Sequence, residues 1–99
     1  MSNILHLTLH KKWFDMILSG EKREEYREIK PYWDKRLCKG HTMVKFVNGY
    51  GADKPWMVVQ VKEHLMSLGI VEWGAPEGVP VHIIRLGNVM CSGNIKDKA

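Results

Sequence analysis

The sequence ILHLTLHKKWFDMILSG, residues 4–20, sets out a strand followed by a helix. Over residues 4–9, Leu5, Leu7 and Leu9 fall on one face, whereas Ile4, His6 and Thr8 fall on the other. This period-two pattern predicts a half-buried strand whose leucines face inward. The apolar residues after it recur at helical spacing, and Gly20 follows as a stop signal. We therefore expect a short amphipathic helix over residues 11–19 that places Trp13 and Ile17 in the core.

Beyond Gly20 the chain contains four more β-prone stretches and one helical turn. The predicted strands cover residues 24–29 (EEYREI), 41–47 (HTMVKFV), 56–65 (WMVVQVKEHL) and 81–86 (VHIIRL). The last strand is expected to continue toward Met90 beyond a bulge. Pro31 opens a brief helical turn that Gly40 ends. Asn48-Gly49 is a strong turn signal, and the Gly- and Pro-rich residues 69–80 read as a loop.

These elements predict an α+β fold that is mostly β. Five strands, an early helix and short connections without strand–helix alternation favour a small, mostly antiparallel barrel or curled sheet. The chain has 99 residues, 44% of them hydrophobic and 26% charged, which fits one globular core. We expect one domain over residues 1–93 and a polar tail over residues 94–99. Periodicity alone does not give the order of the strands.

The excess of positive over negative charge lies in one stretch of the chain. The formal net charge is +4, and the segment from Lys30 to Lys45 holds five basic residues against one acidic residue. The excess therefore favours an anionic partner at that stretch. Two distant cysteines form no CxxC pair, no apolar run approaches the ~20 residues that span a bilayer, and the N-terminus lacks a signal-peptide pattern. These features predict a cytoplasmic protein without a membrane partner.

Sequence motifs for metal or cofactor binding are weak. Cys38 and His41 have a spacing that zinc ligands use, but His64, His82 or Cys91 would have to complete the set from distant positions. Ordinary thiols and histidines are the better interpretation. The sequence contains no phosphate-binding loop, nucleophile elbow or HExxH motif. We therefore predict no metal and no cofactor, and the oligomeric state stays open.

The segment LSGEKREEYR, residues 18–27, carries the most informative polar pattern. In a strand Glu25 and Arg27 project from the same face, and Lys22, in the preceding turn, can lean over that face. Such a cluster can bind a planar polar ligand through bidentate hydrogen bonds, or place a general base beside a cation. A strand-end salt bridge beside a solvated lysine gives the same pattern and is the commoner arrangement.

A strand, a helix ending in ILSG and then G-x-K-x-x-E-x-R resemble the signature of ASCH domains, whose fold is related to the PUA domain. The matching positions are Gly20, Lys22, Glu25 and Arg27. Residues 27–37 (REIKPYWDKRL), 46–50 (FVNGY) and 83–87 (IIRLG) are similar to the small phage-type and bacterial branch, so the resemblance covers about residues 5–89. It implies a PUA-like β-barrel of up to six strands with one or two short helices. It also implies a cleft at Lys22, Glu25 and Arg27 that binds RNA or a modified nucleoside.

Enzymatic activity is left open by this resemblance. One group with a similar fold hydrolyses the acetyl amide of acetylated cytidine, with a threonine nucleophile where this chain has Glu25, and another member has been described as a ribonuclease. A glutamate cannot form the same acyl intermediate by the hydroxyl route. In an enzyme Glu25 would activate water, with Lys22 or Arg27 stabilising the oxyanion. We expect a binding domain, with a hydrolase or a protein-interaction module as alternatives.

The basic stretch adds a predicted nucleic-acid surface. Its cations are Lys30, Lys35, Arg36 and Lys39, with Tyr32 and Trp33 interleaved as stacking surfaces. An amphipathic helical turn with a solvated basic face would show the same pattern. In the loop after residue 47, Tyr50 lies between two glycines and is a candidate to cap a base. A packed tyrosine in a hairpin turn is the alternative interpretation.

Overall fold

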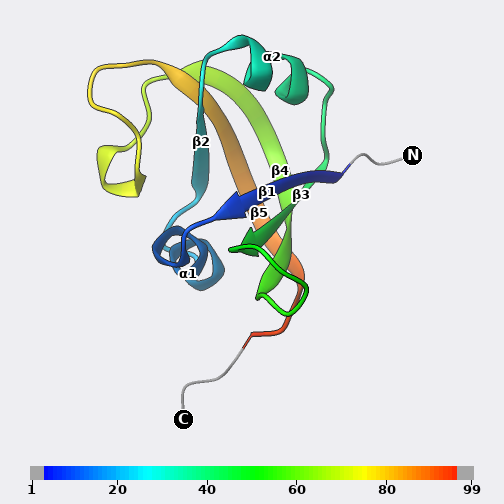
Figure 1. The fold of residues 1–99 in the computed structure, drawn as a ribbon. Coiled ribbons are helices and arrows are strands. Elements are labelled where there is room, and N and C mark those ends of the chain that lie inside the picture. The colour runs from blue at the N-terminus through cyan, green and yellow to red at the C-terminus, as the bar shows by residue number, and fades with distance from the viewer. Residues whose placement is uncertain (1–3, 96–99) are drawn as a thin grey trace.

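The computed structural model describes residues 4–95 and shows a small α+β domain built on one curled sheet (Figure 1). Within these residues the sheet has five strands, β1 (Ile4–Leu9), β2 (Glu24–Glu28), β3 (Met43–Asn48), β4 (Trp56–Ser67) and β5 (Val81–Gly93). Two helices, α1 (Lys11–Ser19) and α2 (Pro31–Leu37), lie at opposite ends of the sheet, and a 3-10 turn, η1 (Val71–Trp73), follows β4. The predicted fold class is confirmed, with element ends shifted by a few residues.

The sheet is a half-barrel whose two edges are the first two strands of the chain. The strand order is β1-β3-β4-β5-β2, with β1 parallel to β3 and the other pairs antiparallel. A mostly antiparallel sheet was expected, but the parallel pair was not, because periodicity carries no information on strand order. Over residues 4–95 no sixth strand joins β1 to β2, so the closed barrel implied by the ASCH resemblance is not seen.

Bulges in β5 help to curl the sheet. Val59 pairs with Val89 and Val61 pairs with Leu86, so β5 has one more residue than β4 between these pairs. This is the bulge predicted beyond Leu86. A Cβ on Gly87 would meet the side chain of Gln60 on β4, which would have to shift to make room for it. A bulge bends and twists its strand, and a curled sheet brings its edges back toward each other.

The core lies on the concave face of the sheet and under α1. The three leucines of β1 are buried as predicted, together with Phe14 and Ile17 of α1. The prediction that Trp13 enters the core is wrong. Phe14 and Trp13 are three and four residues before Ile17, so both lie near its helical face, but Phe14 is fully buried whereas Trp13 is only half-buried. A Cβ on Gly74 would lie 3.0 Å from the Trp13 ring, so Trp13 packs against the η1 loop instead.

The loop between β4 and β5 packs on Tyr26 of β2. The hydroxyl of Tyr26 accepts a hydrogen bond from the Ile70 amide at 3.0 Å and donates one to Glu24 at 2.8 Å. This contact holds η1 beside β2. The predicted polar tail, residues 94–99, is described only to residue 95, and its last four residues lie outside the described range. In the described part of the chain, no helix is long and apolar enough to cross a membrane.

Candidate ligand-binding site

A tight turn after α1 places Lys22 beneath β2. Gly20 ends α1 with φ of 89°, a left-handed conformation that glycine adopts without steric cost. The Lys22 amide then donates to the Met16 carbonyl at 2.9 Å, which folds the turn back onto the helix. The side chain of Lys22 is thereby directed into the protein, and only 2% of the residue is exposed.

The ammonium of Lys22 is enclosed by polar and aromatic groups. It donates to the carbonyl of Trp73 in η1 and lies 3.4 Å from a carboxylate oxygen of Glu25. The rings of Trp13 and Tyr26 lie 5.0 and 4.6 Å from the ammonium, in range for cation–π attraction. Burial lowers the pKa of Lys22, and the charge of Glu25 partly opposes that shift. Lys22 therefore supports Glu25 from below and has no free face for a ligand.

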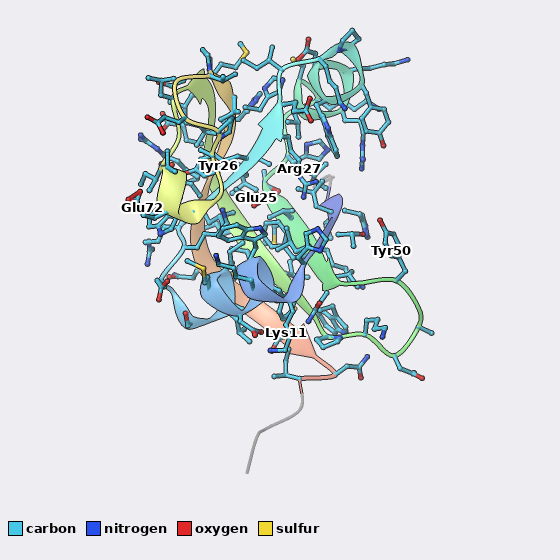
Figure 2. The ribbon with its side chains drawn as sticks, turned by 60° about the vertical axis from the view of Figure 1, so that its left-hand side comes forward. Lys11, Glu25, Tyr26, Arg27, Tyr50 and Glu72 are labelled. Atoms are coloured by element: carbon cyan, nitrogen blue, oxygen red, sulfur yellow. The ribbon has the colours of Figure 1, made fainter. Side chains whose placement is uncertain are left out.

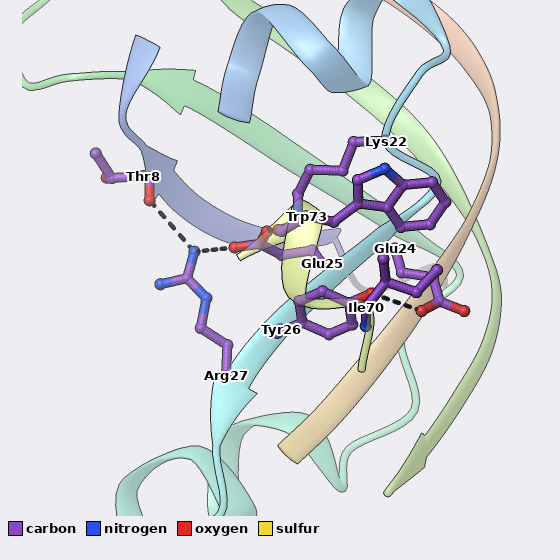
Figure 3. Close-up of polar contacts among 8 residues, drawn as sticks. All are labelled: Thr8, Lys22, Glu24, Glu25, Tyr26, Arg27, Ile70 and Trp73. Carbon is purple, nitrogen blue, oxygen red and sulfur yellow. Dashed lines mark hydrogen bonds and ion pairs between the residues drawn. The ribbon is translucent and has the colours of Figure 1, made fainter. Parts of the chain in front are cut away.

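Glu25 and Arg27 form the pair that the strand period predicts. A guanidinium nitrogen of Arg27 lies 2.8 Å from Glu25 and also donates to the Thr8 carbonyl of β1 at 3.3 Å (Figure 3). Arg27 thus bridges the two edges of the half-barrel. Its Nε is buried and has no hydrogen-bond partner in the described residues. One more acceptor would satisfy this nitrogen, because an unpaired buried donor is costly.

The Glu25–Arg27 pair forms one wall of a cleft of about 400 Å³ between the sheet edges. The lining residues come from β1, α1, β2 and the loop after β3: Thr8, Leu9, His10, Trp13, Glu25, Tyr26, Arg27, Gly49 and Tyr50. Tyr50 is 85% exposed and stands on its loop across from Arg27 (Figure 2). The volume lies within the ~300–1,000 Å³ typical of small-molecule sites. Of the sequence-predicted ligand residues, the cleft brings together Glu25, Arg27 and Tyr50 but not Lys22.

The predicted basic surface adjoins the cleft through a stack of rings and guanidiniums. Arg27 and Arg36 lie 5.0 and 5.2 Å from the ring of Trp33. Arg36 also bonds to the Tyr32 hydroxyl at 3.0 Å and to the His6 carbonyl of β1 at 3.1 Å. Trp33 packs against the core. The remaining predicted cations are exposed, namely Lys30, Lys35 and Lys39.

A second polar cluster, formed by Asp34, His82 and His64, was not recognised in the sequence. The sequence pattern presents the two histidines only as distant candidates for zinc ligands. Their rings meet because β4 pairs with β5, and Asp34 reaches them from α2. A hydrophobic strand interrupted by one buried histidine, VHIIRL, was the available signal. Across residues 4–95 no group of three or more His, Cys, Asp or Glu side chains is arranged to hold a metal ion.

Comparison with known proteins gives no match to any family model, curated protein or solved structure. The resemblance to ASCH domains therefore stays a prediction that rests on Gly20, Lys22, Glu25 and Arg27 and on the segments around them.

Proposed function

We propose that this chain is an ASCH-type domain that binds RNA or a modified nucleoside in the cleft between β1 and β2. The observation that carries the proposal is the composition of the cleft wall. Three aromatic rings line a space of about 400 Å³ together with the buried carboxylate of Glu25 and the partly exposed guanidinium of Arg27. Flat rings favour stacking on a base, and the charged pair offers both a hydrogen-bond donor and an acceptor to the edge of that base.

In this proposal the base is held by Tyr50 and Trp13 and recognised by Arg27 and Glu25. Tyr50 is free to close over a ligand because it is exposed and stands at the rim. Stacking on an aromatic side chain contributes about 1–3 kcal/mol per base. The guanidinium of Arg27 lines the cleft and offers a hydrogen-bond donor to a ligand oxygen.

The role of Lys22 differs from the one that the sequence suggested. We assign it as a positioning residue, because its ammonium is held by Trp73 and Glu25 and does not line the cleft. Contacts to an RNA backbone fall instead to the exposed lysines around α2. Single-stranded RNA lying along α2 would meet Lys30, Lys35 and Lys39, with Tyr32 as a further stacking surface.

The first test separates binding in the cleft from binding elsewhere. Cytidine, acetylated cytidine and uridine are titrated against the protein by calorimetry, together with short single-stranded RNAs. Replacement Tyr50→Ala should weaken nucleoside binding by about fivefold or more, as stacking energies predict. Tyr32→Ala, a matched exposed tyrosine on α2, should leave nucleoside affinity unchanged. Equal affinities of wild type and Tyr50→Ala for every nucleoside would contradict the proposed site.

The second test concerns the backbone contacts. RNA affinity should fall with salt, with a logarithmic slope of about −2 if these three lysines each neutralise one phosphate. Lys35→Ala should make this slope shallower by the share of about one phosphate contact and should leave nucleoside binding unchanged. Arg23→Ala removes an exposed cation that lines neither the cleft nor α2, and should leave the slope as it is. If the slope is the same in wild type and Lys35→Ala, α2 does not contact the RNA backbone.

A hydrolase acting on an amide or on RNA is the second candidate, favoured by the lowered pKa of the buried Lys22 amine beside Glu25. In that reaction Glu25 would take a proton from water while the water oxygen attacks the substrate. Both oxygens of Glu25 are already occupied by cations, which argues for binding over turnover. Release of acetate from acetylated cytidine that Glu25→Gln abolishes, in a variant shown to be folded, would establish the hydrolase.

A further inference from the structure

The cluster of Asp34, His82 and His64 forms a continuous hydrogen-bonded chain across three elements. Nε2 of His82 lies 2.6 Å from a carboxylate oxygen of Asp34 on α2, and Nδ1 of His82 lies 2.9 Å from Nε2 of His64 on β4. His64 is opposite Ile84 in the β4–β5 register, which makes His82 its diagonal neighbour on the same face. His82 is 1% exposed, so the middle of the chain is shielded from water.

Asp34 determines which nitrogens of this hydrogen-bonded chain carry protons. A carboxylate only accepts hydrogen bonds, so His82 donates from Nε2. A neutral His82 then accepts at Nδ1, and His64 must donate from Nε2. The lone pair of His64 is thereby placed on Nδ1, to which no described residue hydrogen-bonds. The outer end of the chain is a proton acceptor.

A proton that arrives at this acceptor can be passed inward. When Nδ1 of His64 takes a proton, the proton on its Nε2 can move to Nδ1 of His82. His64 is then neutral again, and the positive charge resides on His82 beside the carboxylate of Asp34. A carboxylate that orients a histidine base and stabilises its cation is the arrangement found in nucleophile–histidine–carboxylate triads. Here the hydrogen-bonded chain contains two histidines in series.

His64 opens onto a cavity of about 250 Å³ that is separate from the cleft. Its floor is apolar and is formed by Leu5, Leu37, Val61 and Ile84. Its rim carries His41, Lys62 and Glu63, and Glu63 is held by Arg85 at 2.9 Å. The volume is just below the ~300–1,000 Å³ of drug-sized ligands, so a smaller molecule is indicated.

The surroundings of His64 and His41 favour the neutral forms of both histidines. Burial lowers the pKa of His64, and the nearby His82 and His41 lower it further. Burial also lowers the pKa of His41, with Lys39 and Arg36 adding to the shift. On the opposite side, Arg27 of β2 pairs with His82 in the sheet register. The cavity therefore offers a neutral acceptor at its rim with cations close by.

We propose that this cavity is a second binding site, for a small phenol-type compound whose acidic hydroxyl gives its proton to the Asp34–His82–His64 chain. The apolar floor receives the ring, and Nδ1 of His64 takes the hydroxyl proton. The resulting oxyanion remains at the rim, where Lys62 and the cations near His41 stabilise it. Atoms and charge balance, because the proton lost by the hydroxyl appears on His82 and no other reactant is consumed.

The probe for this site is p-nitrophenol, whose ionised form absorbs visible light. Slightly below the pH at which half of the free probe is ionised, adding protein should raise the phenolate absorbance until the site is saturated. His64→Gln removes the acceptor and should abolish the rise. Asp34→Asn keeps a hydrogen-bond acceptor for His82 but removes the charge, and should weaken binding by about tenfold or more. His6→Gln, a matched exposed histidine on β1, should behave as wild type.

Nitrogen NMR of the imidazole rings measures the tautomers of the Asp34–His82–His64 chain in the absence of a ligand. Wild type should show the Nε2–H tautomer for both His64 and His82 at neutral pH. Asp34 is only partly buried and His64 is exposed, so both variants should keep the fold. An Nδ1–H tautomer at His64 would overturn the proposal. So would phenolate absorbance that does not saturate, or equal affinity in wild type and Asp34→Asn.

Discussion

Replacing Glu25 with glutamine tests the buried ion cluster most directly. Glu25 is the shared counter-ion of Lys22, at 3.4 Å, and Arg27, at 2.8 Å. Glutamine has nearly the same shape but no charge, so Glu25→Gln leaves the Lys22 ammonium buried without an opposite charge. Arg27 is less affected, since it is partly exposed and stacks on Trp33. The cost of the change therefore arises mainly at Lys22.

The expected loss of stability is about 3–5 kcal/mol near neutral pH, the usual cost of removing one partner from a buried ion pair. A domain of this size is stable by only about 5–15 kcal/mol, so this loss removes a large part of the folding free energy. With a urea slope of about 1.5 kcal/mol per molar, the midpoint of unfolding falls by about 2–3 M. Equilibrium unfolding followed by circular dichroism measures this shift.

The destabilisation of Glu25→Gln should shrink as the pH rises. Burial lowers the pKa of Lys22 below 10.5, and the charge and hydrogen bond of Glu25 counteract this. Without Glu25 the pKa of Lys22 falls further. Between that lowered pKa and 10.5 the unfolded chain binds more protons than the folded chain, so stability rises with pH across this window. Wild type should show the same trend over a narrower range.

The matched control is Lys22→Met, which keeps the apolar stem of the side chain and leaves Glu25 paired with Arg27. Alone it should cost less than Glu25→Gln. Added to Glu25→Gln it removes the uncompensated charge and should restore about 0.5–3 kcal/mol, the usual coupling between residues in contact. A loss below about 1 kcal/mol in Glu25→Gln, or no recovery in the double variant, would refute the assignment of Lys22 and Glu25 as a coupled buried pair.

Three further substitutions test the packing around the cleft by urea unfolding. Phe46→Ala empties a fully buried position, with 0% exposure, and should cost about 3–5 kcal/mol; a cost below 1 kcal/mol would mean that β3 is not in the core. Gly69→Ala should cost about 1–3 kcal/mol, because the added Cβ would lie 2.7 Å from the Tyr26 ring, and an unchanged midpoint would contradict that contact. Tyr26→Phe removes the bonds to Glu24 and Ile70, so it should cost about 1–3 kcal/mol and speed hydrogen exchange at the Ile70 amide; unaltered exchange would argue against the loop contact.

The local part of the site could be predicted from the sequence. Side chains two apart in a strand share a face, and this rule alone places Glu25 beside Arg27, where the structure has them 2.8 Å apart. The glycine that ends α1 likewise indicated the turn that brings Lys22 within 3.4 Å of Glu25, although Lys22 does not line the cleft as expected. In both cases the determining interactions lie within ten residues of chain, where periodicity and backbone preference are informative.

The non-local part could not be predicted. The burial of Lys22 depends on the Trp73 carbonyl, 51 residues away, and therefore on how the loop after β4 packs on Tyr26. Trp13 and Phe14 are adjacent aromatic residues, and only the position of η1 decides which of them enters the core. His64 and His82 meet because of the register between β4 and β5, which alternation alone does not define.

The location of the cleft follows from the way the open edge of β1 is satisfied. An edge strand presents backbone groups that need partners, and here the carbonyls of His6 and Thr8 accept hydrogen bonds from Arg36 and Arg27. Arginine side chains thus do at this edge what a sixth strand would do in a closed barrel. Because side chains are longer and fewer than a backbone ladder, they leave a gap between β1 and β2. The residues that close the half-barrel are therefore the same residues that give the cleft its charge and its stacking surface.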